Sequence, residues 1–199
     1  MKEHISIRIE ENLARVENLI SLYSRKKGKG RRGAHETDVL RAAVVLLHAS
    51  LEDFLRSLAR WIIPETNEMS VLDRYPFPGD SNLKRPEKVS LGYLIAFKGI
   101  SIDDVIKQAV NEHLDKSNYN NTNEIAGLLT SIGVEISAVE SVFPELSEMM
   151  SRRHLIVHRA DRVDSMGSGN YKVKSIGIAQ LNKWVKSVRA FTSSVLEKL

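Results

Sequence analysis

The chain of 199 residues contains no cysteine and has no long hydrophobic run. The lack of cysteine excludes disulfides, zinc–thiolate sites and cysteine nucleophiles, and it fits a reducing compartment. The longest apolar run, Ala42 to Leu47, is far shorter than the roughly 20 residues that span a bilayer. The N-terminus becomes charged and amphipathic at once and has no apolar signal core. We therefore expect a soluble, cytoplasmic protein with no membrane partner.

Proline is scarce and unevenly placed. Four of the five prolines lie between Pro64 and Ser90, around the sequence Tyr75-Pro76-Phe77-Pro78. Because proline inside a helix removes a hydrogen bond and clashes with the preceding turn, no continuous helix is expected there. We interpret residues 64–90 as a loop insertion. Tyr75 and Phe77 either fold back onto the protein or are available to an RNA base or a protein partner, and the sequence leaves both open.

Elsewhere, apolar residues recur at steps of three and four, which is typical of amphipathic helices. The pattern runs from Ile5 to Tyr23, and resumes after Thr37 or Asp38, either of which can cap a helix that ends at Pro64. Further helices are predicted over Leu91 to Phe97, Ile102 to Leu114, Asn123 to Ser131, from near Pro144 to Arg159, and around Leu181 to Val195. Strand character is confined to Tyr171–Lys174. The expected fold is one all-α helical bundle over residues 1–199.

Basic residues are concentrated in one stretch, although the formal net charge is only +4. The segment RKKGKGRRG places six cations between the first two predicted helices: Arg25, Lys26, Lys27, Lys29, Arg31 and Arg32. Such a tract can neutralise nucleic-acid phosphates without reading bases. It is equally consistent with a solvated loop between helices.

The densest polar cluster of the chain runs from Ser151 to Asp161. Within it, His154 and His158 are one helical turn apart and share a face. Arg153 and His158 are five residues apart and therefore point about 140° away from one another on an ideal helix. Taken alone, arginine and histidine near a helix C-terminus also form a favourable cap of the helix dipole.

Arg153-His154-Leu155-Ile156-Val157-His158 resembles the R-x(4–6)-H motif of HEPN domains, with His154 in the polar position after the arginine. Arg152 matches the five-residue spacing. The stretch from Leu47 to Arg56 resembles the helix that packs beside the motif helix, and Asn118 to Val134 is similar to the region before the motif in stand-alone RiboL-PSP-type HEPN proteins. The resemblance covers Asp38 to Leu199, so residues 34–199 are the best supported part of the domain.

This resemblance implies a HEPN-like four-helix bundle and a metal-independent endoribonuclease that needs no cofactor. In such enzymes the ribose 2′-OH attacks the adjacent phosphorus, at a site assembled across a two-fold dimer. By analogy, His158 is the acid–base group, Arg153 binds the phosphate and His154 assists. Arg152 and Glu52 are supporting residues, and a structural ion pair between Glu52 and Arg153 or Arg152 is expected. His48, on the same apolar stripe, is expected to be a hydrogen-bonded core or interface residue.

Three classes of function follow. The first is a homodimeric HEPN ribonuclease, acting as a toxin or defence effector with RNA and an antitoxin or regulatory protein as partners. The second is a catalytically silent HEPN module that binds RNA or a protein. The third is a helical adaptor with no nucleic-acid role. A metal site made by His154, His158 and Asp161 is a further reading of the histidine spacing.

Overall fold

The computed structural model describes residues 1–25, 34–79, 91–162 and 173–199. The basic tract at Lys26, Lys27, Lys29, Arg31 and Arg32 lies outside these residues. The long α-helices are α1 (Lys2–Arg25), α2 (Ala34–Ile62), α4 (Ile102–Lys116), α5 (Thr122–Ser131), α6 (Phe143–Arg159) and α7 (Ile178–Lys198). Shorter pieces are α3 (Met69–Leu72) and the 3₁₀ segments η1 (Ile63–Glu65), η2 (Leu91–Phe97), η3 (Ile136–Ala138) and η4 (Glu140–Val142).

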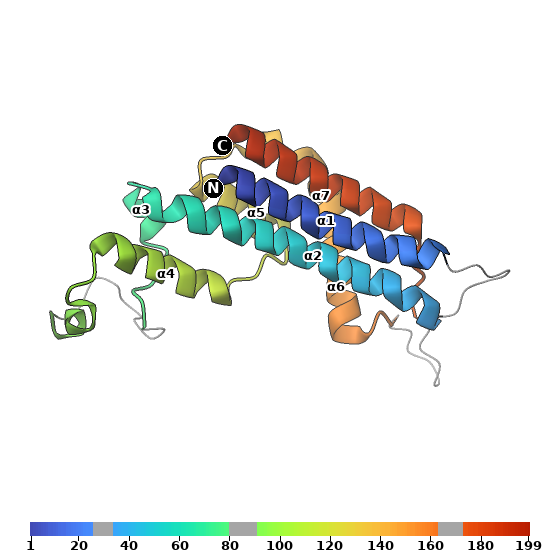
Figure 1. Ribbon diagram of the computed structural model, residues 1–199, viewed down its shortest axis with the longest axis horizontal. Coiled ribbons are helices and arrows are strands. Elements are labelled where there is room, and N and C mark those ends of the chain that lie inside the picture. Colours follow the sequence, from blue (N-terminus) through green and yellow to red (C-terminus); the bar gives the residue numbers. More distant parts are fainter. Residues whose placement is uncertain (26–33, 80–90, 163–172) are drawn as a thin grey trace.

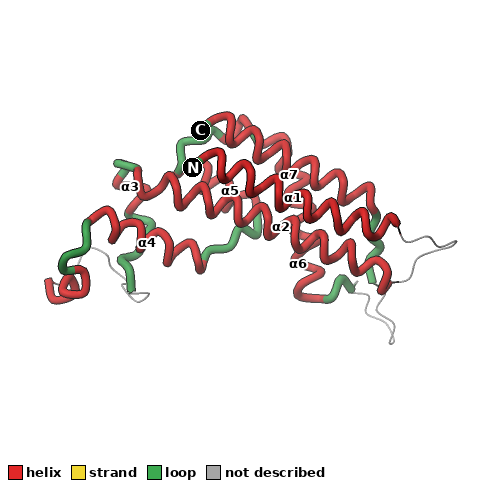
Figure 2. The backbone as a smooth tube through the Cα atoms, viewed as in Figure 1, coloured by secondary structure: helices red, strands yellow, loops and turns green. Residues whose placement is uncertain are grey.

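Four long helices pack together as the bundle: α1, α2, α6 and α7. Figure 1 shows α1 antiparallel to both α2 and α7, while α6 passes behind them and its C-terminal end emerges below α2. In Figure 2 all the regular structure of the described residues is helical. The predicted all-α helical bundle is confirmed.

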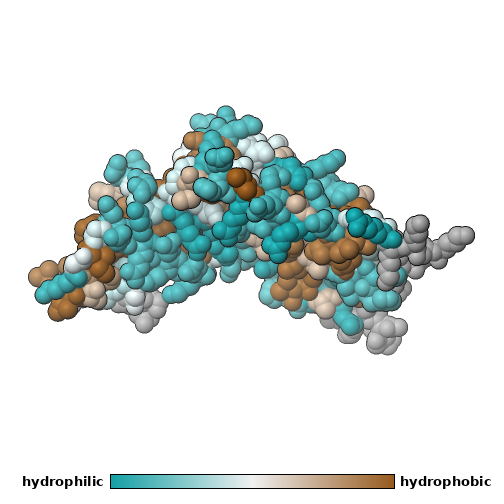
Figure 3. Space-filling view, viewed as in Figure 1, coloured by the Kyte–Doolittle hydropathy of each residue, from teal (hydrophilic) through white to brown (hydrophobic). Residues whose placement is uncertain are grey.

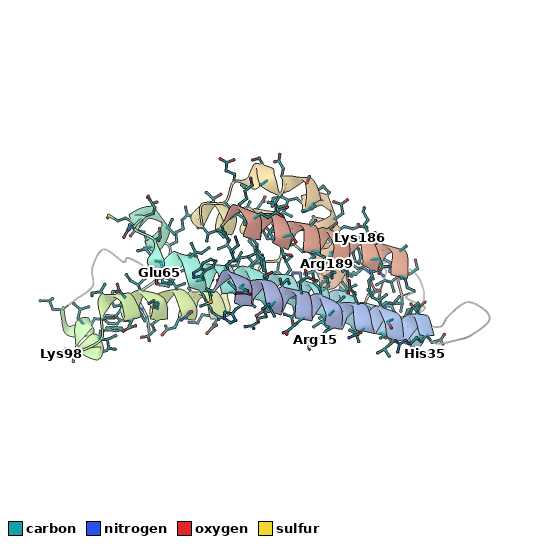
Figure 4. The ribbon with its side chains drawn as sticks, turned by 45° about the horizontal axis from the view of Figure 1, so that its top comes forward. Arg15, His35, Glu65, Lys98, Lys186 and Arg189 are labelled. Carbon is teal, nitrogen blue, oxygen red and sulfur yellow. The ribbon has the colours of Figure 1, made fainter. Side chains whose placement is uncertain are left out.

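The apolar stripes predicted from the sequence meet in one core. Leu13 and Val16 of α1 and Leu47 and Leu51 of α2 are completely buried. Phe54 of α2 meets Phe191 of α7 edge to face, with ring centroids 6.4 Å apart. Each such side chain stabilises the fold by about 1.5–3 kcal/mol on burial. Arg189 of α7, labelled in Figure 4, joins the outside of the same helices by donating to Glu17 of α1 at 3.0 Å.

Most helix boundaries agree with those predicted from the sequence. Ser101 caps α4 by accepting a hydrogen bond from the Asp104 amide at 3.1 Å, and Pro144 stands in the first turn of α6. The predicted start of α2 is wrong, because the helix begins at Ala34 rather than after Thr37 or Asp38. Both side chains accept hydrogen bonds from Arg41 one turn later, at 2.5 and 3.1 Å, so they serve as partners within the helix.

Helix α4 and η2 form an arm beside the bundle. The arm is attached to α2 through Arg56, which donates to the Ser117 carbonyl at 2.6 Å, and through an ion pair between Arg60 and Asp115. Figure 4 places Lys98 on this arm and His35 on α2 at opposite ends of the molecule. Hydrophobic residues gather at the tip of the arm in Figure 3, where Leu91 is 84% exposed.

The aromatic residues of the proline-rich segment fold back onto the protein. Tyr75 contacts the ring of His113 at 5.0 Å, and Phe77 packs edge to face on Tyr93 and Phe97 of η2. Both side chains are half-buried. They therefore hold the arm together, which is the first of the two alternatives that the sequence left open.

Two observations complete the fold. The strand-like character near Tyr171–Lys174 is represented in the described residues by an isolated antiparallel bridge between Arg162 and Val173. Among the helices of the described ranges, none combines the length and the apolar character needed to cross a membrane.

Candidate active site

The polar cluster occupies the last turns of α6 and the turn that follows. The N-terminal part of this helix is anchored in the core by Leu146, Met149 and Met150, all at most 3% exposed. The helix ends at Ala160, whose backbone is left-handed with φ of 48°, and Asp161 follows with φ of 59°. Non-glycine residues seldom adopt this conformation, so the turn needs tertiary contacts to hold it.

Those contacts come from two buried arginines. The Asp161 side chain is completely buried, and its Oδ2 accepts hydrogen bonds from Arg41 Nε at 2.7 Å and Arg152 Nη2 at 2.8 Å. Arg152 also donates to the carbonyls of Lys174 and Ser175, at 3.0 and 2.9 Å. This buried ion cluster joins α2, the end of α6 and the segment before α7. Asp161 is thus engaged by arginines, and no group of three His, Cys, Asp or Glu side chains in the described ranges is placed to hold a metal ion.

The two candidate arginines of the motif consequently differ. Arg152 is 5% exposed and committed to Asp161. Arg153 is half-buried and makes only a long contact, 3.4 Å from its Nη1 to Asn120 Oδ1, and its Nε has no hydrogen-bond partner among the described residues. Of the two, Arg152 is paired with a carboxylate, whereas Arg153 has no carboxylate partner among the described residues, so the Nη groups of Arg153 are the more available to an added anion.

His154 and His158 lie side by side on the outer face of α6. Their ring centroids are 4.5 Å apart and both side chains are exposed. An imidazole ring can both accept and donate a proton, so the pair is suited to acid–base chemistry. Between the directions of Arg153 and His158 on the helix lies Val157, which is 47% exposed.

Arg153 and His158 do not meet within one chain. Helix α6 continues without interruption to Arg159, so the divergence of about 140° expected from an ideal helix applies. No hydrogen bond joins the two side chains, which both lie in the described part of the chain. One copy of α6 thus presents Arg153 and His158 on different faces.

Helix α2 contributes a second polar group beside Arg153. Glu52 accepts a hydrogen bond from the Tyr119 amide at 3.1 Å and pairs with Arg56 at 3.7 Å and with His48 Nδ1 at 3.6 Å. The expected ion pair of Glu52 with Arg153 or Arg152 is wrong, because Arg56 is the ion-pair partner of this carboxylate and Arg152 is paired with Asp161.

His48 is a buried core residue, as the sequence predicts. It is 1% exposed, and its Nε2–H donates to the Tyr119 carbonyl at 3.1 Å. Burial lowers the pKa of His48 below its ordinary value of 6.5, and the positive charges of Arg153 and Arg56 act in the same direction, whereas Glu52 opposes them. The positive charge of Arg153 therefore contributes to the lowered pKa of His48 on α2.

Sequence reasoning missed the loop at Tyr119 and Asn120, which connects α4 to α5. Its main chain binds His48 and Glu52, and its Asn120 amide faces Arg153. No periodicity or motif marks these residues. The only signal was the resemblance of the region from Asn118 onward, which named no individual role.

Comparison with known proteins gives one match. The family described as RiboL-PSP-HEPN matches residues 10–199. No curated protein and no solved structure matched the chain. The family match covers most of α1 and the whole of α2, α6 and α7, including the Arg153-to-His158 segment, so the chain belongs to the RiboL-PSP-HEPN family.

Proposed function

We propose that this protein is a metal-independent endoribonuclease, with residues 1–199 acting as one HEPN domain. The observation that carries the proposal is the presence, near the end of one helix, of two adjacent exposed imidazoles and of the Arg153 guanidinium, which no carboxylate of the described residues pairs with. Family membership supports a HEPN module. The residues present are those that RNA cleavage by an internal nucleophile requires.

The reaction needs two proton transfers and stabilisation of charge. A histidine, His158 with His154 beside it, accepts the proton of a ribose 2′-OH as that oxygen bonds to the adjacent phosphorus. The bond from phosphorus to the 5′ oxygen of the next nucleotide breaks, and that oxygen is protonated. The products are a 2′,3′-cyclic phosphate and a 5′-OH. Arg153 binds the nonbridging oxygens, where negative charge increases in the transition state.

A second copy of the chain completes the site in this proposal. Arg153 and His158 diverge on one helix, and the exposed Val157 lies between them. Packing two α6 helices about a two-fold axis through this apolar residue covers it and brings Arg153 of one protomer toward the His158 of the other. The homodimer is thus a requirement of the chemistry.

A role as toxin or defence effector, inhibited by an antitoxin or regulatory protein, is proposed from family analogy.

The second candidate function is a silent HEPN module that binds RNA or a partner protein. The half-buried state of Arg153 and its contact with Asn120 favour this alternative, because a guanidinium held by the protein is less available to a transition state.

Cleavage assays in EDTA distinguish the two. Wild-type protein incubated with single-stranded RNA is expected to produce fragments with cyclic phosphate ends, and His158→Ala and Arg153→Ala are expected to reduce cleavage at least a hundredfold. His4→Ala, which alters an exposed histidine on α1, is the matched control and should cleave normally. RNA binding without cleavage by the wild type would establish the silent module.

A further inference from the structure

A groove of about 420 Å³ lies between α6 and α7, on the side of α6 away from His48. Its polar lining includes Ser147, Glu148, Ser151, Lys174 and Gln180, and Leu155 contributes an apolar wall. This volume is in the range of clefts that hold small ligands. None of the functional residues predicted from the sequence, apart from the buried Arg152, lines this groove.

The carboxylate of Glu148 is held in a fixed orientation within the groove. Its Oε2 accepts a hydrogen bond from Trp184 Nε1 at 3.0 Å, and its Oε1 accepts one from Gln180 Nε2 at 2.9 Å. Trp184 is itself only 1% exposed, so the anchor does not move freely. Each carboxylate oxygen can accept a further hydrogen bond, and Glu148 is exposed. The groove therefore offers a rigid pair of adjacent acceptors.

A rigid pair of acceptors selects a ligand with two adjacent N–H donors in one plane. Among the RNA bases, guanine has such an edge, formed by its N1–H and its 2-amino group. Adenine and cytosine place an acceptor next to their amino group, and uracil has one donor between two acceptors. Single-stranded RNA exposes these Watson–Crick edges to proteins. A site built for hydrogen bonding strongly rejects a ligand that leaves its polar groups unpaired.

The groove is in line with the histidine pair. Ser147, Ser151, His154 and His158 follow one another at steps of four, three and four, and all are exposed, so they form one stripe along α6. Glu148 lies about 15 Å from His158 along the helix axis, at 1.5 Å per residue. The exposed Lys174 adds a positive charge at the groove for a phosphate.

From this arrangement we infer that the groove binds a guanine base of the RNA substrate, a short distance along the strand from the cleaved bond. The inference rests on the proposed ribonuclease function for its substrate, but it concerns binding and not cleavage. It makes Glu148 the residue that determines specificity.

The test measures binding with 2′-O-methyl RNA, which cannot be cleaved by 2′-OH attack. Fluorescence anisotropy compares oligouridine strands that contain one guanosine, one inosine or one adenosine. Wild-type protein is expected to bind the guanosine strand at least tenfold more tightly than the adenosine strand, because two charge-assisted hydrogen bonds are lost in the latter. Inosine, which lacks the 2-amino group, should fall between them.

Glu148→Gln is expected to abolish the guanosine preference and to leave the affinity for the adenosine strand within about threefold. Glu145→Gln is the matched control on the same helix, since Glu145 pairs with Lys183 at 3.2 Å outside the groove, and it should keep the preference. Equal binding of all strands by the wild type, or a preference that survives in Glu148→Gln, would overturn the inference. Tighter binding of guanosine monophosphate than of the oligomer would assign the groove to a free nucleotide and overturn it as well. A guanosine preference in a protein that does not cleave RNA would leave this inference standing and refute the ribonuclease.

Discussion

Arg152 donates a hydrogen bond to the buried Asp161 at 2.8 Å, across the left-handed turn that ends α6. Arg41 of α2 donates to the same carboxylate oxygen at 2.7 Å. The motif helix is thereby joined at its C-terminal end to the start of α2, just beyond the histidine pair. The position of His158 depends on this buried ion cluster.

Asp161→Ala is expected to lower the free energy of unfolding by about 3–5 kcal/mol, because it leaves the buried Arg152 without its counter-ion and removes the buried carboxylate partner of Arg41, which keeps the exposed Asp38. Urea unfolding followed by circular dichroism measures this loss. Glu11→Ala removes an exposed carboxylate of α1 and should change the free energy by no more than about 0.5 kcal/mol. A loss below about 1 kcal/mol for Asp161→Ala would show that the cluster is not what holds the turn.

Adjacent arginines should give opposite phenotypes. Arg152→Ala is expected to destabilise the fold by about 3–5 kcal/mol. The substitution removes one of the two arginine partners of the buried Asp161 carboxylate and leaves a cavity where the guanidinium was. Arg153→Ala is expected to change stability by about 1 kcal/mol or less, because it loses one long contact to Asn120, and yet to lose RNA cleavage. Urea unfolding and cleavage assays on both variants make the comparison. The reverse pattern would transfer the phosphate-binding role to Arg152.

Val157→Glu is expected to convert a dimer into monomers and to remove cleavage, because it places two like charges at the proposed two-fold axis. Analytical ultracentrifugation measures the mass. Ile7→Glu alters a side chain of α1 that is 51% exposed, compared with 47% for Val157, and should leave the dimer intact. An active Val157→Glu monomer would refute the composite site.

Stability should fall as the pH is lowered below about 6.5. Burial and Arg153 lower the pKa of His48 in the folded protein. At a pH between this lowered pKa and the ordinary pKa of 6.5, His48 is protonated in the unfolded chain and neutral in the folded chain. The free energy of unfolding then decreases with falling pH, by up to about 1.4 kcal/mol per pH unit, and levels off below the folded pKa. His48→Gln, studied by urea unfolding from pH 8 to 5, should flatten this slope.

His113 is the comparison for that experiment, because burial and Lys116 lower its pKa as well. It is only half-buried, so His113→Gln should remove a smaller part of the slope. A slope unchanged in His48→Gln would show that other groups carry the acid sensitivity.

The basic tract predicts a salt effect. Replacing Lys26, Lys27, Lys29, Arg31 and Arg32 by glutamine is expected to weaken RNA binding uniformly across sequences and to reduce the salt dependence. Each lost phosphate contact lowers the slope of log K against log salt by about 0.7 for a single strand. Binding titrations between 50 and 300 mM salt, with wild type alongside, give the slope. An unaltered slope would identify the tract as a solvated loop.

Much of the fold was predictable because it depends on local patterns. The apolar stripes of α1 and α7, the Ser101 cap and the proline at the start of α6 act within a few residues, and each appears where expected. The start of α2 was not predictable from Thr37 and Asp38, since Arg41 competes for both side chains.

The candidate site was likewise predictable only in part. Sequence by itself determined that a guanidinium and two imidazoles stand near the end of one helix, with His154 and His158 on one face, because the 3.6-residue period determines these relations. Tertiary structure alone decided which arginine is available. Arg152 and Arg153 are chemically identical neighbours, and they differ because Asp161, in a left-handed turn, draws one of them into the core. Tertiary structure also brought Asn120 to Arg153 and fixed Glu148 between Trp184 and Gln180. Each of these contacts joins residues more than 30 positions apart in the sequence, and only the packing of the bundle places them together.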